Sequence, residues 1–131
     1  MSSSDEPKRI RILMPSIGEL YAELSNQAPK TCRAVWEVLP IESRISRWGD
    51  EIYFSIGIDI EPENYSEFVR KGDLGYWPPG KALCIFFGPT PISLGEEIRA
   101  AGPVNIFGHL IDDPEVFKEA RGGEKIRIER G

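Results

Sequence analysis

The chain has 131 residues, of which 40% are hydrophobic and 28% are charged, and its formal net charge is −5. This length and composition predict one globular domain rather than a disordered chain, and the negative charge argues against nonspecific nucleic-acid binding. No segment approaches the roughly 20 apolar residues of a membrane-spanning helix, and the polar start does not resemble a signal peptide. We therefore expect a cytoplasmic protein with neither a membrane nor a nucleic-acid partner.

Residues 1–8 are predicted to form a disordered tail, and residues 9–131 the domain. Arg9–Met14 and Glu19–Leu24 both alternate apolar and polar side chains, which is typical of the two arms of a hairpin. The turn between them contains a proline and a glycine. This pattern predicts that the domain begins with a strand pair.

A helix is predicted to follow this hairpin. Asn26 is a candidate N-cap, and Pro29 suits the first helical turn. The apolar residues then recur with helical spacing up to about Leu39, where Pro40 ends the pattern. Beyond it, two strands are predicted over Ile41–Trp48 and Glu51–Ile58.

The segment Gly72–Pro91 carries the clearest pattern in the chain. Leu74–Trp77 is predicted to be a short strand, and Pro78-Pro79-Gly80 has strong turn chemistry. Ala82–Phe87 is six apolar residues in a row, which favours a strand that is buried on both faces. Both sides of that strand must therefore be covered.

The last third of the chain is less uniform. Glu96–Ala101 is compatible with one helical turn or a loop, and Val104–Ile111 is predicted to be a strand. Asp112–Ala120 reads as a short helix and Glu124–Arg130 as the last strand. That strand resembles the first, with isoleucines on one face and basic residues on the other. We expect the two to pair and close the sheet, with the basic row as solvated surface rather than a phosphate site.

Few residues point to catalysis. Cys32 and Cys84 are expected to be buried, reduced thiols, and with a single histidine the chain has no zinc-site spacing. His109 is expected on the surface. The Asp50-Glu51 pair is interpreted as a solvated hairpin turn rather than an acid–base pair. We therefore predict no metal and no cofactor.

The aromatic residues suggest a binding cleft instead. Ligand pockets commonly combine apolar walls with a few polar groups. The alternative interpretation is that these aromatic side chains fill the core. The ligand-binding candidates are Arg47, Trp48, Glu51, Tyr53, Tyr76, Trp77, Lys81 and Phe87.

The order of the predicted elements resembles that of cyclophilins. The resemblance rests on Ala28-Pro29-Lys30-Thr31, Phe86-Phe87 and Ile106-Phe107-Gly108. More specifically, the segments Trp48–Phe54 and Gly72–Gly88 resemble the small prokaryotic cyclophilin-like proteins, which have no settled biochemical role. The resemblance implies an all-β fold: a closed, eight-stranded barrel with two short helices.

Proline isomerisation carries over less well from this resemblance. Arg47 and Phe87 could match the cyclophilin arginine and phenylalanine, but Ile52, Ser55 and Val104 stand where a cleft aromatic, glutamine and histidine would be. Three functions therefore remain open. They are a module that binds a small molecule or short peptide in an aromatic cleft, a diverged peptidyl-prolyl isomerase, and a structural or interaction protein without a small ligand.

Overall fold

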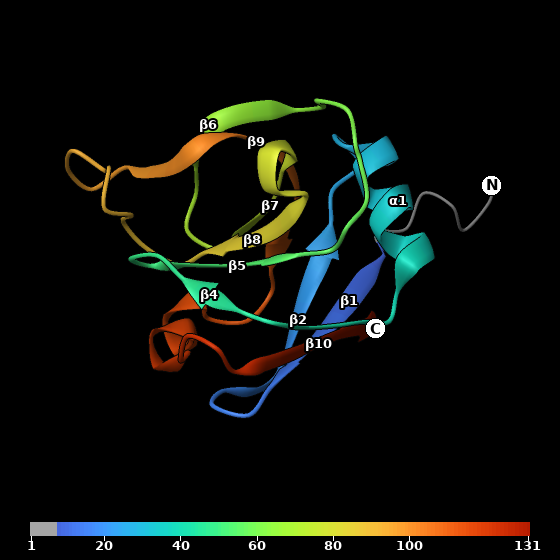
Figure 1. Cartoon of the computed structure of the whole chain (residues 1–131), viewed down its shortest axis with the longest axis horizontal. Coiled ribbons are helices and arrows are strands. Elements are labelled where there is room, and N and C mark those ends of the chain that lie inside the picture. Colours follow the sequence, from blue (N-terminus) through green and yellow to red (C-terminus); the bar gives the residue numbers. More distant parts are fainter. Residues whose placement is uncertain (1–7) are drawn as a thin grey trace.

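The computed structural model describes residues 8–131, so the predicted tail over residues 1–8 lies, apart from Lys8, outside the described residues. Within this range the elements are β1 (Arg9–Met14), β2 (Gly18–Leu24), α1 (Pro29–Val38), β3 (Ile41–Arg44), β4 (Ser46–Arg47), β5 (Glu51–Ser55), β6 (Tyr65–Val69), β7 (Asp73–Trp77), β8 (Ala82–Phe86), β9 (Ile98–Leu110) and β10 (Lys125–Arg130). Short 3₁₀ helices occupy Pro78–Gly80 and Pro114–Glu119. Figure 1 shows α1 at one end of the sheet and the second 3₁₀ helix at the other. The all-β class is confirmed, and α1 and the second 3₁₀ helix occupy the two places where short helices were predicted.

The terminal strands pair as their sequences predict. Alternation buries Ile10 and Ile12 on β1, and Ile126 and Ile128 on β10, while the intervening basic residues stay on the outer face. β1 lies antiparallel to β10, with Ile12 opposite Ile128, and also pairs with β2. The matching isoleucine pattern therefore did identify two neighbouring strands.

The sheet does not close through this pair. Its hydrogen-bonded order is β3-β10-β1-β2-β9-β7-β8-β5-β4, with β6 added to β9. The path thus ends at β3 and β4, which are joined in the chain by Ile45, and among the described residues no ladder links these two strands. The structure has ten strands rather than eight, and the closed barrel is not confirmed.

Helix α1 is capped from a distance. The predicted cap, Asn26, is wrong: the N-cap residue is Ala28, which makes no side-chain cap. Instead the Glu63 carboxylate accepts hydrogen bonds from the backbone amides of Lys30, at 3.1 Å, and Thr31, at 2.8 Å. These amides are among those that a helix leaves without an intrahelical acceptor, and a carboxylate there also complements the helix dipole. Neither α1 nor any other helix in the described range is long and apolar enough to cross a membrane.

Strand β9 differs from the prediction made for this part of the chain. The expectation of a helical turn or loop over Glu96–Ala101 is wrong from Ile98 onward, because one strand of 13 residues runs from there to Leu110. Its first half pairs with β6, and its second half with β7 and β2. The first half thereby forms an arm that reaches over the outer face of β8.

This arm creates a second apolar cluster. Leu83 and Ile85 of β8 point into the main core, which most of the buried strand residues share. Cys84 and Phe86 point the opposite way and pack with Ile98 and other residues of the arm. The prediction that β8 is buried on both faces is confirmed, since all five of its residues are buried.

Candidate functional site

A cavity of about 160 Å³ lies between the outer face of β5 and β8 and the arm of β9. It is lined by Trp48, Glu51, Tyr53, Trp77, Cys84, Ala100, Ala101 and Val104. The structure thus brings together four of the eight candidate residues, three of them aromatic. We call this space the aromatic cavity.

A tight turn holds Trp48 and Glu51 at the cavity. The Trp48 amide donates to the Glu51 carbonyl at 2.9 Å, and the Glu51 amide donates back at 3.2 Å. Gly49 between them has φ +61°, and a Cβ there would lie 2.7 Å from Cδ of Pro91. The turn therefore requires glycine for both its backbone conformation and its packing. The Asp50 amide also donates to the Pro89 carbonyl, which anchors the turn to the next segment.

Trp77 enters the cavity from the end of β7. The 3₁₀ turn that follows places Gly80 directly against the indole, because a Cβ on Gly80 would lie 2.8 Å from ring carbons of Trp77. Lys81 then adopts φ 48° and its amide donates to the Pro78 carbonyl at 3.1 Å. The Pro-Pro-Gly turn thus supports one face of the tryptophan ring.

Small residues make room for the floor of the cavity. Cys84 of β8 lies opposite Gly75 of β7 in the ladder. A Cβ on Gly75 would lie 2.8 Å from Cγ2 of Val104, so this glycine lets the β9 arm approach closely. Ala100 and Ala101 complete the arm's side. The space exists because short side chains face the aromatic ones.

Glu51 is the polar feature of the cavity. Its relative exposure is 5%, and none of the described residues gives its Oε1 atom a hydrogen-bond partner. Burial raises the pKa of Glu51 to about 7, and the neighbouring Cys84 thiol offsets only part of that rise. The interpretation of Asp50-Glu51 as a solvated turn is therefore wrong for Glu51. Its side chain lies on the outer face of β5 together with that of Tyr53, at the cavity formed with the β9 arm.

The two cysteines are both free thiols in the described part of the chain. Burial and the neighbouring Glu51 carboxylate raise the pKa of Cys84 well above its usual value. Burial raises the pKa of Cys32 to about 11. Since the thiolate is the reactive form, neither site favours nucleophilic chemistry near neutral pH.

Arg47 and Phe87 lie outside the aromatic cavity. The guanidinium of Arg47 donates to the carbonyls of Lys118 and Ala120, both at 2.9 Å, and covers the ring of Phe87 at 5.1 Å. Phe87 is fully buried and stacks on Phe117. Arg47 and Phe87 thus connect the second 3₁₀ helix to the sheet through hydrogen bonds and ring stacking.

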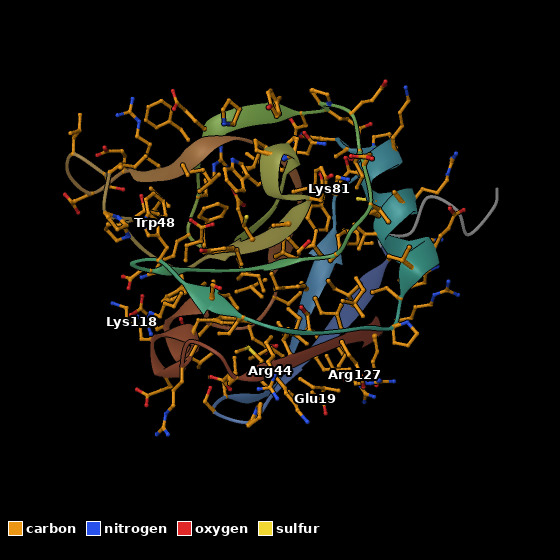
Figure 2. All side chains as sticks on the ribbon, in the orientation of Figure 1. Glu19, Arg44, Trp48, Lys81, Lys118 and Arg127 are labelled. Carbon is orange, nitrogen blue, oxygen red and sulfur yellow. The ribbon has the colours of Figure 1, made fainter. Side chains whose placement is uncertain are left out.

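The two remaining candidates also lie elsewhere. Tyr76 is fully buried on the core side of β7, and its hydroxyl donates to the Ile58 carbonyl at 2.6 Å. Lys81 is exposed, pairs with Asp59 at 3.5 Å and lies away from Trp48 in Figure 2. Tyr76 therefore follows the alternative interpretation, in which aromatic side chains fill the core.

Sequence reasoning did not include four of the lining residues among the ligand-binding candidates: Cys84, Ala100, Ala101 and Val104. A signal existed for Cys84, which lies on the face of β8 opposite Leu83. The alanines carried none, because the strand containing them was not recognised. Their position depends on the bend of β9 over β8.

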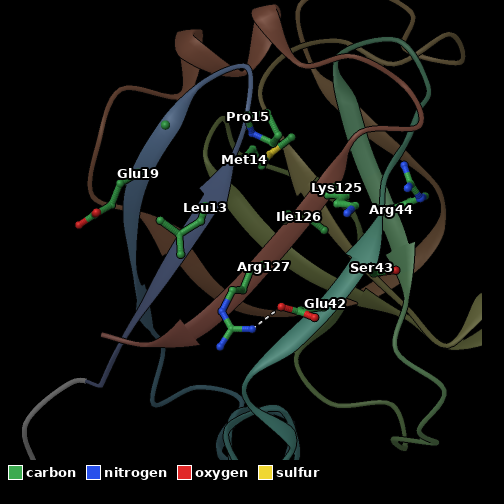
Figure 3. Close-up of a pocket in the computed structure, with 11 residues that line it drawn as sticks. Leu13, Met14, Pro15, Glu19, Glu42, Ser43, Arg44, Lys125, Ile126 and Arg127 are labelled. Atoms are coloured by element: carbon green, nitrogen blue, oxygen red, sulfur yellow. Dashed lines mark hydrogen bonds and ion pairs between the residues drawn. The ribbon is translucent and has the colours of Figure 1, made fainter.

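A second, larger concavity of about 710 Å³ lies on the outer face of β1, β2, β3 and β10 (Figure 3). One of its basic residues is engaged with carboxylates: Arg127 pairs with Glu42 and Glu129. Arg44 donates to the Gly123 carbonyl at 2.9 Å. The partly exposed side chain of Arg127 fits the expectation that the basic row is solvated surface.

Comparisons with known proteins agree with this architecture. The sequence family described as cyclophilin-like matches residues 8–129. The solution structure of a hypothetical protein from Archaeoglobus fulgidus is 41% identical, with a TM-score of 0.85 and 100% of both chains covered. A cyclophilin-type peptidyl-prolyl cis-trans isomerase from Cryptosporidium parvum is 20% identical, with a TM-score of 0.56 over 95% of this chain and 98% of that one, a likeness of fold. No match was found among curated proteins. The chain belongs to the cyclophilin-like family.

Proposed function

We propose that this protein binds a small molecule, or one side chain of a short peptide, in the aromatic cavity. The observation that carries the proposal is a buried carboxyl group at an aromatic-lined space. A buried polar group that lacks a partner is unfavourable by about 1–3 kcal/mol, and more when it is charged. A ligand that supplies a hydrogen-bond donor would recover that free energy.

The size and lining of the cavity support a compact ligand. A volume of about 160 Å³ is comparable to an apolar protein cavity of about 150 Å³ that holds benzene. Trp48, Tyr53 and Trp77 offer flat apolar surface, and Glu51 offers one polar anchor. This combination is the usual one for small-molecule sites.

The alternative of a diverged isomerase has weaker support. An arginine that stabilises the twisting amide must have free donors in the cleft, whereas Arg47 donates to backbone carbonyls of the second 3₁₀ helix. We expect Ala-Pro peptides to be isomerised very slowly or not at all in a protease-coupled assay. A rate within about tenfold of an ordinary cyclophilin, or ~1.4 kcal/mol in barrier, would contradict this.

Amide chemical shifts in a titration with indole or cyclohexanol test the binding proposal. We expect perturbations at Trp48, Tyr53 and Trp77, and none around Arg127 on the second concavity. Ala101 is exposed and lines the cavity, so Ala101→Phe should block the entrance with little effect on folding. Glu96→Phe, at another exposed position near the arm, is the matched control. Equal perturbation in both variants, or none in the wild type, would refute the proposal.

A further inference from the structure

The charges around the aromatic cavity restrict what it can hold. Glu51 is its only carboxyl group, and the described residues that line it include no lysine, arginine or histidine. The other titratable groups that line the cavity with Glu51 are Tyr53 on β5 and Cys84 on β8, while β7 and β9 contribute Trp77 and apolar side chains. An anionic ligand would find no complementary charge and would be repelled by an ionised Glu51.

Arg47 and Arg99, on the neighbouring turn and on the β9 arm, lie against carboxylates other than Glu51, and the Nε atom of Arg99 has no hydrogen-bond partner among the described residues. The guanidinium of Arg47 pairs with Asp50 at 3.3 Å, in the same turn as Glu51. Arg99, on the β9 arm, lies 3.8 Å from Glu67 and covers the ring of Phe68 at 5.1 Å. The protein therefore builds a buried acid without giving it a side-chain cation, which leaves that position for a cationic ligand.

We infer that the ligand of the aromatic cavity is a small alkylammonium ion, with Glu51 as its counter-ion. The inference rests on the proposed function and specifies its ligand. An ammonium group would donate to the carboxylate, and its alkyl part would lie among Trp48, Tyr53 and Trp77. Tryptophan and tyrosine rings also attract cations through their π-electron faces, most strongly where water is excluded.

Binding should also depend on pH in a defined direction. The raised pKa of Glu51 means that the carboxyl is largely protonated in mildly acidic solution and ionised in mildly basic solution. A cation favours the ionised form, so its affinity should rise with pH through about 7. A ligand that accepts a hydrogen bond from the protonated acid would show the opposite trend. The direction therefore separates two chemistries for one site.

The experiment compares cyclohexylammonium chloride with cyclohexanol, which has a similar shape but no charge, by calorimetry or by tryptophan fluorescence. At about pH 8 we expect the cation to bind about tenfold more tightly than the alcohol in the wild type. In Glu51→Gln this preference should disappear while affinity for the alcohol is retained. A preference that survives in the variant would overturn the role of Glu51.

Two further outcomes keep the proposals separate. Equal binding of both probes by the wild type would overturn the cationic ligand while leaving the binding cavity intact, and binding of neither would refute the proposed function itself. If Glu51→Gln does not fold, a pH titration of the wild type decides the question. The amine stays protonated below about pH 9, as lysine does. Its advantage over the alcohol should therefore grow between about pH 5.5 and 8.5, and a constant or falling advantage would overturn the inference.

Discussion

The two faces of β8 are covered in different ways. On one face, Leu83 and Ile85 pack into the main core with residues from most of the other strands. On the other face, Cys84 and Phe86 are covered by the first half of β9 and by partly buried aromatic residues. Within residues 8–131 both faces of β8 are buried, and the aromatic cavity with its acidic group lies at the second face.

The comparison shows how one apolar strand serves two purposes. The main core gains its stability from close packing of branched aliphatic and aromatic side chains. The outer cluster gives up part of that packing, since small residues at Ala100 and Ala101 leave space. A change on the first face should therefore affect stability, and a change on the second face should affect the cavity.

Truncation on the core face should have the largest effect. Ile85→Ala removes a fully packed side chain, and we expect it to lower the free energy of unfolding by roughly 2–5 kcal/mol. Urea denaturation followed by circular dichroism measures this. Cys84→Ala, the neighbouring position on the outer face, is the matched comparison and should have a smaller effect. A larger loss from Cys84→Ala would reverse our view of the two faces.

The next effect concerns Glu51 and pH. Because its pKa is about 7 in the folded protein and near 4.5 in an unfolded chain, the folded state binds more protons between these values. The free energy of unfolding should therefore fall by roughly 3 kcal/mol, for Glu51 alone, as pH rises from about 4.5 to 7. Above that pH it should level off.

Glu51→Gln should remove this contribution. Urea denaturation at pH 5 and pH 8 gives the free energy of unfolding of the variant minus that of the wild type. This difference should be more positive at pH 8 than at pH 5. Glu96→Gln, which changes an exposed carboxylate, is the control and should show no such difference. A pH dependence that is unchanged in Glu51→Gln would mean that Glu51 is not the buried acid described here.

A smaller effect is expected at the support of Trp77. Gly80→Ala places a methyl group against the indole, which must shift, and the stability loss should be about 1 kcal/mol. The fluorescence of Trp77 should change with it, and so should ligand affinity. Gly122→Ala is a suitable control because a Cβ there meets nothing within 4 Å. Unchanged fluorescence would argue that Gly80 does not position the ring.

The smallest effect is expected on the ion-paired outer row. Arg127→Ala removes pairs with Glu42 and Glu129 on a partly exposed surface. Such pairs contribute little and are screened by salt. The difference in free energy of unfolding between the variant and the wild type should therefore be small at low salt and smaller still at high salt, as denaturation curves measure. Binding in the aromatic cavity should not change. Loss of cavity binding would show that the two surfaces are coupled.

Much of the fold could be predicted because local patterns and the final packing agree. The alternation in β1, β2 and β10 places their apolar residues on one face of the sheet, since successive strand residues face opposite sides. The apolar run at Ala82–Phe87 likewise requires cover on both faces. Helix α1 was found, but its cap was not. Glu63 is distant in sequence, so no local pattern connects it with the helix.

Local patterns in the sequence predicted most of the strands, the helix α1 and the aromatic candidates Trp48, Tyr53 and Trp77, but they missed the first half of β9. Which aromatic residues meet depends on how distant segments pack. Tyr76 and Trp77 are neighbours in β7, yet the pleat sends one into the core and the other to the cavity. The same holds for Asp50 and Glu51, of which only Glu51 is buried. Burial depends on what the β9 arm covers, and that contact joins segments far apart in the chain.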